Sequence, residues 1–235
     1  MLPVYNPREF AYLHHRISER TGIAANDMRI KHPYRMLRSL RDYIDWQKRA
    51  YAAPSPPDVK QACLLRNGIP GATWVETGTY MGHTTEILSK HGAMTYSIEP
   101  EPALFENARR RFSGTRNVEI INGTSEDIFP TLLPRISGDV NFWLDGHYSG
   151  GITYKGARDT PIADELAVIA DNLGHFRGVC VLVDDLRCFE SSPENRAEYP
   201  SLDSLVDWAR SHELRWHIEH DILVAKRGEM LVGGE

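Results

Sequence analysis

The hydrophobic pattern divides the chain into two parts. Between His32 and Tyr51, apolar residues recur at helical spacing among Arg, Lys and Asp, which predicts an amphipathic helix. The proline-rich segment APSPP ends this helix, because proline cannot donate the backbone hydrogen bond that a helix needs. We therefore expect an N-terminal helical extension over residues 1–56 and a second domain over residues 57–235.

The second part alternates short apolar runs with helix-sized segments. A helix over DVKQACLLRNG comes first, and five strands follow it: ATWVE, MTYSIE, NVEIING, DVNFWLD and GVCVLVDD. This alternation is typical of a buried parallel sheet with helices on both faces. The last segment, LRWHIEHDILVAKRG, contains no helix and predicts an antiparallel hairpin. The expected fold class is α/β: a Rossmann-like, doubly wound, mostly parallel seven-stranded sheet with a C-terminal hairpin.

Composition and charge narrow the class of partner. With 235 residues and 41% hydrophobic positions, the chain can close one sizeable core. Its net charge of -5 gives no bulk attraction to nucleic acid or to an anionic membrane, so a small-molecule ligand is expected. The sequence leaves a homo-oligomer open.

Cysteine usage and the chain's apolar runs bear on its location. Three cysteines without CxxC spacing argue against disulfides and against zinc. The first residues lack a signal pattern, and the longest apolar run, VCVLV, is too short to span a bilayer. We therefore expect a cytoplasmic protein.

The stretch WVETGTYMGHTTEIL predicts a strand, a turn and a helix, with glycine only at Gly78 and Gly82. A dinucleotide-binding loop needs a middle glycine where its backbone meets the pyrophosphate, and Tyr80 would obstruct that approach. A ligand without phosphate that carries a sulfonium and an ammonium gains instead from nearby carboxylates. S-adenosylmethionine is such a ligand. Glu76 would face its ammonium, and Glu99, about 20 positions after Gly78, would bind both ribose hydroxyls.

These residues also have a purely structural interpretation. Gly78 and Gly82 can shape a turn without any ligand, and Glu99 can cap the helix that is expected to begin at Pro102. The occurrence of both acids at consecutive strand ends favours the cofactor site.

Several motifs together resemble the class I S-adenosylmethionine-dependent methyltransferases. They are ETGTYMG, the acid in SIEP, NGTSED after the third strand, and the acids after strands four and five, and the resemblance covers roughly residues 57–228. It implies that the cofactor is bound by Glu76, Thr77, Gly78, Gly82, Glu99, Ser125, Glu126 and Asp145. Ser125 and Glu126 would lie beside the adenine, although TSED equally predicts a helix-capping box.

Aspartates end the fourth and fifth predicted strands. One crossover helix joins these strands, so they can be neighbours about 4.8 Å apart, with Asp145 beside Asp184 and Asp185. Repulsion among three carboxylates calls for a proton or a cation. Oxygen ligands without His or Cys favour Mg²⁺, or Ca²⁺ or Mn²⁺, over zinc. Alternatively, Asp185 caps a helix and Asp145 begins a turn.

This spacing resembles the metal-dependent O-methyltransferases of the catechol and macrocin types. In those families the cation binds the substrate's hydroxyl oxygens and lowers the pKa of the one that is methylated. The chain has Tyr148 where the catechol type has a lysine, and His147 where the macrocin type has a second acid. His147 is therefore a candidate catalytic base beside Asp145, with metal binding or a loop hydrogen bond as alternatives.

The stretch GHYSGGITYKGARDT, residues 146–160, is long and rich in glycine, which predicts a lid over the site. The expected function is methyl transfer from S-adenosylmethionine to a hydroxyl of a small molecule, with Mg²⁺. The resemblance suggests a sugar or a polyketide-type natural product as the acceptor. Two alternatives stay open: a metal-dependent, non-methylating enzyme similar to the cephalosporin hydroxylases, and a non-catalytic S-adenosylmethionine-binding module.

Overall fold

The structure is a computed structural model that describes residues 33–146, 160–189 and 199–227. The chain divides into two compact units, Met1–Arg66 and Asn67–Glu235, and each is described by itself. The expected domain boundary at residue 57 coincides with the start of helix α3 (Pro57–Asn67), whereas the two units divide near its end.

The first unit contains helix α2 (Pro33–Lys48) and most of α3. Tyr43 and Trp46 of α2 lie one helical turn apart and form a buried apolar cluster with Val59 of α3. The two aromatic rings meet edge to face, with centroids 5.9 Å apart. The predicted amphipathic helix is present, and these aromatic residues serve its packing.

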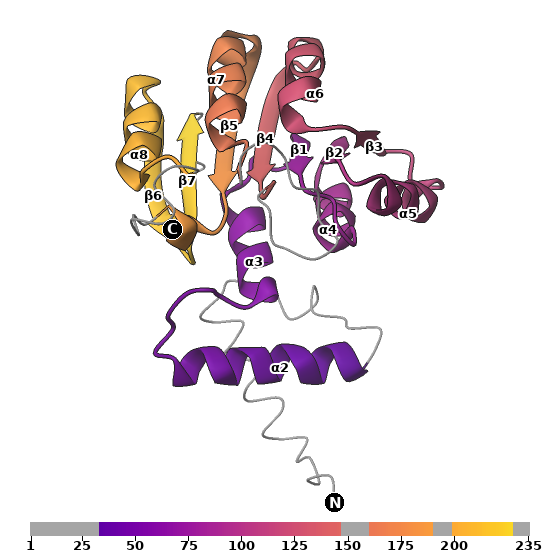
Figure 1. The fold of residues 1–235 in the computed structure, drawn as a ribbon, viewed down its shortest axis with the longest axis vertical. Coiled ribbons are helices and arrows are strands. Elements are labelled where there is room, and N and C mark those ends of the chain that lie inside the picture. The colour runs from indigo at the N-terminus through magenta and orange to yellow at the C-terminus, as the bar shows by residue number, and fades with distance from the viewer. Residues whose placement is uncertain (1–32, 147–159, 190–198, 228–235) are drawn as a thin grey trace, which may run out of the picture. The chain divides into compact units, whose positions relative to one another are not determined.

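The second unit is built on one seven-stranded sheet, shown in Figure 1, with strand order β3-β2-β1-β4-β5-β7-β6. The strands are β1 (Thr73–Thr77), β2 (Thr95–Glu99), β3 (Val118–Asn122), β4 (Gly138–Leu144), β5 (Phe176–Val183), β6 (Arg215–Glu219) and β7 (Ile222–Arg227). The first five strands pair in parallel, and β7 is antiparallel to both β5 and β6. The predicted mostly parallel sheet and its closing hairpin are confirmed.

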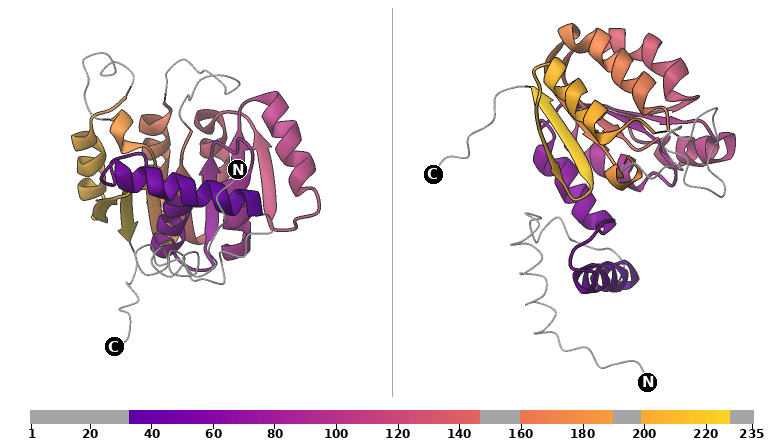
Figure 2. Two further views of the ribbon diagram at one scale, coloured as in Figure 1. Left: turned by 90° about the horizontal axis from the view of Figure 1, so that it is seen from below. Right: turned by 60° about the vertical axis from the view of Figure 1, so that its left-hand side comes forward.

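Helices cover both faces of the sheet. They are α4 (His83–His91), α5 (Pro102–Phe112), α6 (Ser125–Leu132), α7 (Ile162–Asn172) and α8 (Leu202–Ser211), with short 3-10 turns η1 (Leu133–Arg135), η2 (Leu173–His175) and η3 (Leu186–Cys188). Figure 2 shows α6, α7 and α8 together on one face and α4 and α5 on the other. This arrangement is the Rossmann-like α/β fold expected from the sequence.

The core lies around the two central strands β4 and β5. Phe142 of β4 is fully buried and contacts the rings of Phe129 from α6 and Phe176 from β5, with centroids 6.3 and 5.8 Å away. Strands that are buried on both faces are near-continuously apolar, and this explains why the sequence of β5 shows no alternation.

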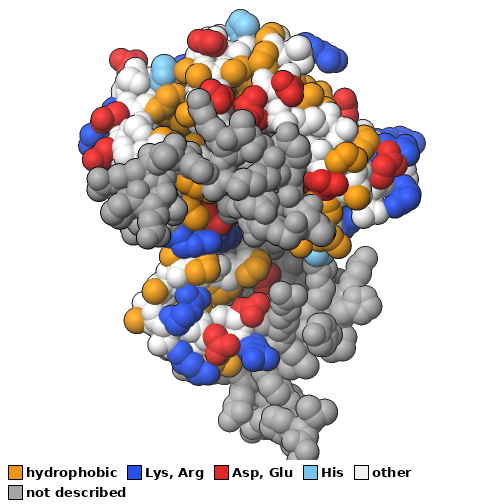
Figure 3. Space-filling model, viewed as in Figure 1, with side chains coloured by type: hydrophobic (Ala, Val, Ile, Leu, Met, Phe, Trp, Pro, Cys, Tyr) orange, Lys and Arg blue, Asp and Glu red, His pale blue; other side chains and the backbone are white. Residues whose placement is uncertain are grey.

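The described surface mixes charges of both signs. On the face drawn in Figure 3, acidic and basic side chains are interspersed with hydrophobic ones. Among the described residues, none of the helices is both long and apolar enough to cross a membrane.

The strand order reverses between β1 and β4. From β1 the chain continues outward to β2 and β3, and then returns to β4 on the other side of β1. Ligands of open α/β sheets bind at such a switch point, at the carboxyl ends of the strands. At this point Gly78 has a φ of +86°, and a Cβ on it would lie 2.7 Å from the carbonyl oxygen of Asp145. Only glycine fits there without a shift of the backbone.

Replacing Gly78 tests this close approach. Gly78→Ala should destabilise the fold by the cost of a positive φ, about 1–2 kcal/mol, plus a further ~1–3 kcal/mol for the clash with Asp145. Gly138→Ala is the matched control, because Gly138 has a similar φ of +84° and a Cβ on it would meet no heavy atom within 4 Å beyond its chain neighbours. Denaturant unfolding measures both variants. Equal losses would contradict the clash.

Candidate functional site

The turn after β1 has the geometry that its two glycines predict. The Gly78 amide donates to the carbonyl of Ile98 at 3.0 Å, which ties the turn to β2. Gly82 has a φ of +71°, and a Cβ there would meet the ring of Phe112 at 2.7 Å. The close approach at Gly82 therefore involves α5, in addition to the start of α4.

Glu99 ends β2 beside this turn. Its carboxylate accepts hydrogen bonds from the backbone amides of Tyr80, at 2.8 Å, and Glu101, at 3.0 Å. Burial raises its pKa, and these two bonds partly offset the rise. Each carboxylate oxygen can accept more than one hydrogen bond, so Glu99 fixes the turn and keeps capacity for a ligand.

The Glu76 side chain points toward α4, on the face of the sheet that α4 covers. Its Oε2 accepts hydrogen bonds from the hydroxyls of Thr85 and Ser97, both at 2.5 Å. Burial raises its pKa to about 7; the two hydroxyls lower it in part, and Asp145 and Glu99 add to the rise. Glu76 is thus the centre of a buried polar network at the switch point.

The start of α6 supports the capping interpretation of TSED. The Thr124 hydroxyl accepts from the backbone amide of Asp127 at 3.4 Å, and its side chain also contacts the Asp127 carboxylate at 3.0 Å. Ser125 is buried as the first residue of the helix, and its hydroxyl bonds the Glu126 carboxylate at 3.3 Å. The TSED segment therefore forms a helix cap, with Ser125 as the first residue of α6.

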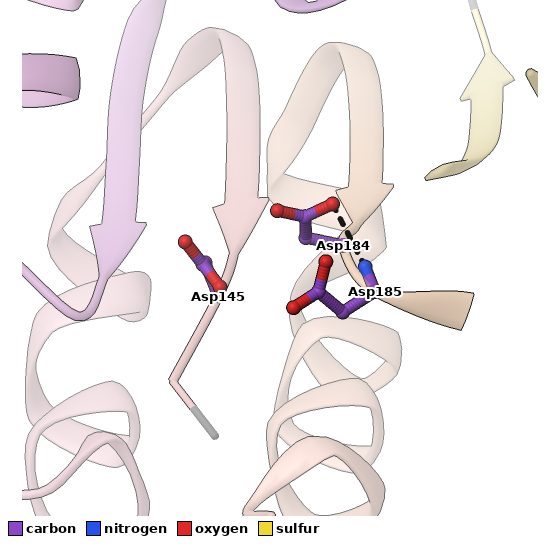
Figure 4. Close-up of side chains that lie close together, drawn as sticks. All are labelled: Asp145, Asp184 and Asp185. Atoms are coloured by element: carbon purple, nitrogen blue, oxygen red, sulfur yellow. Dashed lines mark hydrogen bonds between the residues drawn. The ribbon is translucent and has the colours of Figure 1, made fainter. Parts of the chain in front are cut away.

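The three aspartates predicted to meet do meet. Asp145 follows β4, and Asp184 and Asp185 follow the adjacent strand β5, as Figure 4 shows. One carboxylate oxygen of each lies within 4.8 Å of those of the other two. The Asp184 Oδ1 also accepts the Asp185 amide at 2.8 Å, which fixes one side chain against the next residue's backbone. The site is a compact, all-oxygen cluster.

The segment after β5 holds Asp185 in an unusual conformation. Asp185 has a φ of +56° and precedes η3 without a side-chain capping bond, so the helix-cap interpretation is not supported for this side chain. Its Oδ1 instead pairs with Nη1 of Arg187 at 2.5 Å. Burial works to lower the pKa of Arg187, but hydrogen bonds to Asp185 and Asp221 outweigh it and raise the pKa.

Glu165 is a site residue that the sequence analysis missed. It lies on α7 with 1% of its surface exposed. Burial raises its pKa to about 7; Ser125 and Thr77 lower it in part, and Glu126 and Asp145 raise it further. Within the described residues neither Glu165 Oε1 nor Thr77 Oγ1 makes a hydrogen bond of good geometry, although the Thr77 hydroxyl is near enough to lower the pKa of Glu165.

A signal for Glu165 exists in the sequence. Ile162, Leu166 and Ile169 form the apolar face of α7, and Glu165 falls on that same face by helical spacing. An acid at a core position of an amphipathic helix is rare unless it has a partner or a role.

A small pocket adjoins the aspartates on the side of α7. Its lining includes Glu165, Asp184, Asp185, Cys188, Phe189 and Tyr199. Phe189 and Tyr199 stack edge to face with centroids 5.2 Å apart. The pocket therefore brings an aromatic pair next to carboxylates.

Several sequence predictions fall on residues 147–159, which lie outside the described residues. They are the base His147, its neighbour Tyr148 at the position of the catechol-type lysine, and all of the predicted lid except its end residues Gly146 and Thr160.

No protein-family model and no curated protein matches the sequence. Solved structures with a similar fold include SMU.1697c from Streptococcus mutans in complex with S-adenosylhomocysteine, at 12% identity, 75% of this chain, 99% of that chain and a TM-score of 0.47. The N-methyltransferase NodS from Bradyrhizobium japonicum is similar at 12% identity, over 71% of this chain and 92% of that chain, with a TM-score of 0.47. The 23S rRNA methyltransferase ErmE is similar at 14% identity, over 74% of this chain and 70% of that chain, with a TM-score of 0.45. Similarity at this level does not bear on the activity of this chain.

Replacing Glu165 should change how stability depends on pH. The Glu165 carboxyl has a pKa of about 7 in the folded protein and an ordinary value of 4.5. Between pH 4.5 and pH 7 it is therefore mostly protonated in the folded state and mostly ionised in the unfolded state. Stability therefore falls as pH rises from about 4.5 to about 7, at up to ~1.4 kcal/mol per pH unit. Glu165→Gln should make this slope shallower and should stabilise the protein at pH 8 relative to the parent.

Urea unfolding between pH 5 and 8 measures the slope. Glu119→Gln, at an exposed position on β3, controls for the loss of one carboxylate. The Glu76 carboxyl contributes a slope of the same sign, so part of the pH dependence should persist in Glu165→Gln. A variant with an unchanged slope would refute the assignment to Glu165.

Proposed function

We propose that this chain transfers a methyl group from S-adenosylmethionine to a hydroxyl of a small molecule, with Mg²⁺ held by Asp145, Asp184 and Asp185. The observation that carries the proposal is that Asp145 contacts the turn after β1 and also belongs to the aspartate cluster. Its backbone carbonyl packs against Gly78 in the turn after β1. Its carboxylate belongs to the aspartate cluster. A donor bound at the turn and an acceptor bound at the cluster would therefore be neighbours.

The residues around the turn fit the methyl donor. The donor is cationic, and the carboxyls of Glu76, Glu99 and Asp145 interact electrostatically at this edge of the sheet. Thr77 Oγ1 and Glu165 Oε1, two buried polar atoms that make no hydrogen bond of good geometry among the described residues, lie on the face of α6 and α7. Such atoms are costly unless a ligand or water completes them. We assign Glu99 to the ribose, and Ser125 and Glu126 to the adenine side.

The aspartate cluster fits a hard divalent cation. Three carboxylates with oxygens within 4.8 Å provide charged oxygen ligands of the kind that Mg²⁺, Mn²⁺ and Ca²⁺ prefer. A cation bound there would lower the pKa of an acceptor hydroxyl. The aspartates would hold the cation, and Phe189 and Tyr199 would exclude water from the adjoining pocket.

Methyl transfer needs in-line alignment and loss of the hydroxyl proton. The methyl group moves to the acceptor oxygen, the donor sulfur keeps the electron pair of the broken bond, and a base takes the proton. Asp145 would align the two reactants, because it contacts the donor turn and belongs to the aspartate cluster. Reactants that are held in one geometry react as if they were at high concentration. His147 remains the predicted base.

Net charge and the resemblance noted above support a proposal for the class of acceptor. The net charge of -5 and the mixed surface in Figure 3 disfavour nucleic acid as the substrate. A sugar or polyketide-type hydroxyl, in a molecule that also has apolar surface for Phe189 and Tyr199, is the proposed acceptor class.

Removing the charge of Glu99 should weaken donor binding. Glu99→Gln should raise the dissociation constant of S-adenosylmethionine roughly 10- to 100-fold, because charge-assisted hydrogen bonds contribute about 1.5–3 kcal/mol each. Calorimetry on the folded variant measures it, with Glu119→Gln as control. Unchanged affinity would remove Glu99 from the donor site, and tighter binding of NAD than of S-adenosylmethionine by the parent would refute the donor assignment altogether.

Removing the cation should abolish turnover and spare donor binding. In excess EDTA, methylation of an acceptor should stop and should return with added Mg²⁺. S-adenosylmethionine affinity should stay within about twofold, because most donor residues lie at β1, β2 and β3 and Asp145 keeps its carboxylate without the cation. Asp184→Asn should reproduce the effect of the chelator. Full activity in EDTA would refute the cation and leave His147 to activate the hydroxyl. Donor binding without turnover on any acceptor would favour a sensing module.

A further inference from the structure

The aspartate cluster already has a positive partner in the protein. Arg187 lies two residues after Asp185, and its Nη1 is 2.5 Å from the Asp185 Oδ1. The Asp185 side chain is only 11% exposed and that of Arg187 is 36% exposed, so water screens this ion pair incompletely. Arg187 therefore offsets part of the negative charge that would otherwise attract a metal ion.

Asp221 holds Arg187 in this position. It belongs to the turn between β6 and β7, and its side chain is 5% exposed. Its carboxylate accepts the Arg187 backbone amide at 2.8 Å and forms an ion pair with the same Nη1 that contacts Asp185. Its backbone carbonyl also accepts the Leu186 amide at 3.0 Å. A residue far along the chain thus anchors the segment that follows the cluster.

We infer that Arg187 is a resident counter-cation of the aspartate cluster, which competes with a divalent cation for Asp185, and that Asp221 limits this competition by sharing the guanidinium charge. The inference rests on the proposed cation site. It assigns Arg187 and Asp221 a role in setting metal affinity, although neither is a proposed metal ligand.

The electrostatics give the two residues opposite effects. A guanidinium on Asp185 repels a second cation and occupies one of the two oxygens of the Asp185 carboxylate. The Asp221 carboxylate neutralises part of that guanidinium and adds negative charge near the cluster. Removing Arg187 should therefore strengthen metal binding, and removing the charge of Asp221 should weaken it. A purely structural role for the pair predicts that both changes weaken binding.

Titration of the full chain with Mn²⁺, followed by electron paramagnetic resonance, provides the test. Arg187→Gln should bind Mn²⁺ about 3- to 10-fold more tightly than the parent, and Asp221→Asn should bind it less tightly by a similar factor, since one screened charge contributes on the order of 1 kcal/mol. Arg187→Lys, which keeps the charge, should stay near the parent. These readouts need no acceptor and no turnover.

Arg177→Gln is the matched control for net charge. Arg177 forms an exposed pair with Asp139 near the amino ends of β4 and β5, at the opposite end of the strands from the cluster. Its loss should leave Mn²⁺ affinity within about twofold, because exposed charges at that range are screened.

The outcomes separate the inference from the proposed function. Weaker Mn²⁺ binding in both Arg187→Gln and Asp221→Asn, or no change in Arg187→Gln, would overturn the competition while leaving the cation site intact. A parent that binds Mn²⁺ no better than Asp184→Asn, with Arg187→Gln equally poor, would overturn both the cation site and the counter-cation. If Arg187→Gln fails to fold, tighter binding in Arg187→Lys than in the parent would still count against a competing charge.

Discussion

The parallel register of β1, β4 and β5 is the constraint on which the candidate site depends. Thr77 pairs with Leu144, and Leu144 pairs with Val183, so the three strands end at one level. The next residues along these strands are Gly78, Asp145 and Asp184, and a bond of 3.1 Å from the Asp184 amide to the Leu144 carbonyl continues the pairing past the strand end. A slip of one residue would send each side chain to the opposite face of the sheet. Both halves of the site would then be lost together.

Those parts of the molecule that depend on local pattern were predictable from the sequence. Strands and helices followed from apolar runs and glycine positions, and the meeting of Asp145 with Asp184 followed from a single crossover between consecutive strands. The contact between Asp185, Arg187 and Asp221 could not be found in this way. It requires that β7 pair with β5, which brings the turn between β6 and β7 next to η3. The sequence predicted that hairpin but not its place in the sheet.

Glu165 was missed for a different reason. The other candidate acids follow apolar runs at strand ends, where the sequence pattern marks them. Glu165 instead lies within a helix, on the side that faces the core. Glu165 and Glu76 both have a raised pKa because they are buried, and hydroxyl groups offset only part of that cost. Acids that are kept in such places at the expense of stability are common at functional sites. Glu76 and Glu165 lie on opposite faces of the sheet, and both interact electrostatically with Asp145.

The place of β7 also bears on how the domain is completed. It is the last strand of the sheet along the described chain, yet it lies inside the sheet, between β5 and β6. During synthesis β5 therefore keeps one unpaired edge until nearly all of the described chain has been made, and an unpaired edge is open to other strands. The same late pairing brings Asp221 to Arg187. A ribosome-bound chain that lacks the final hairpin would thus have its aspartates and Arg187 but not Asp221, which holds Arg187 and shares its charge. The site would therefore acquire its electrostatic balance only in the last stage of folding.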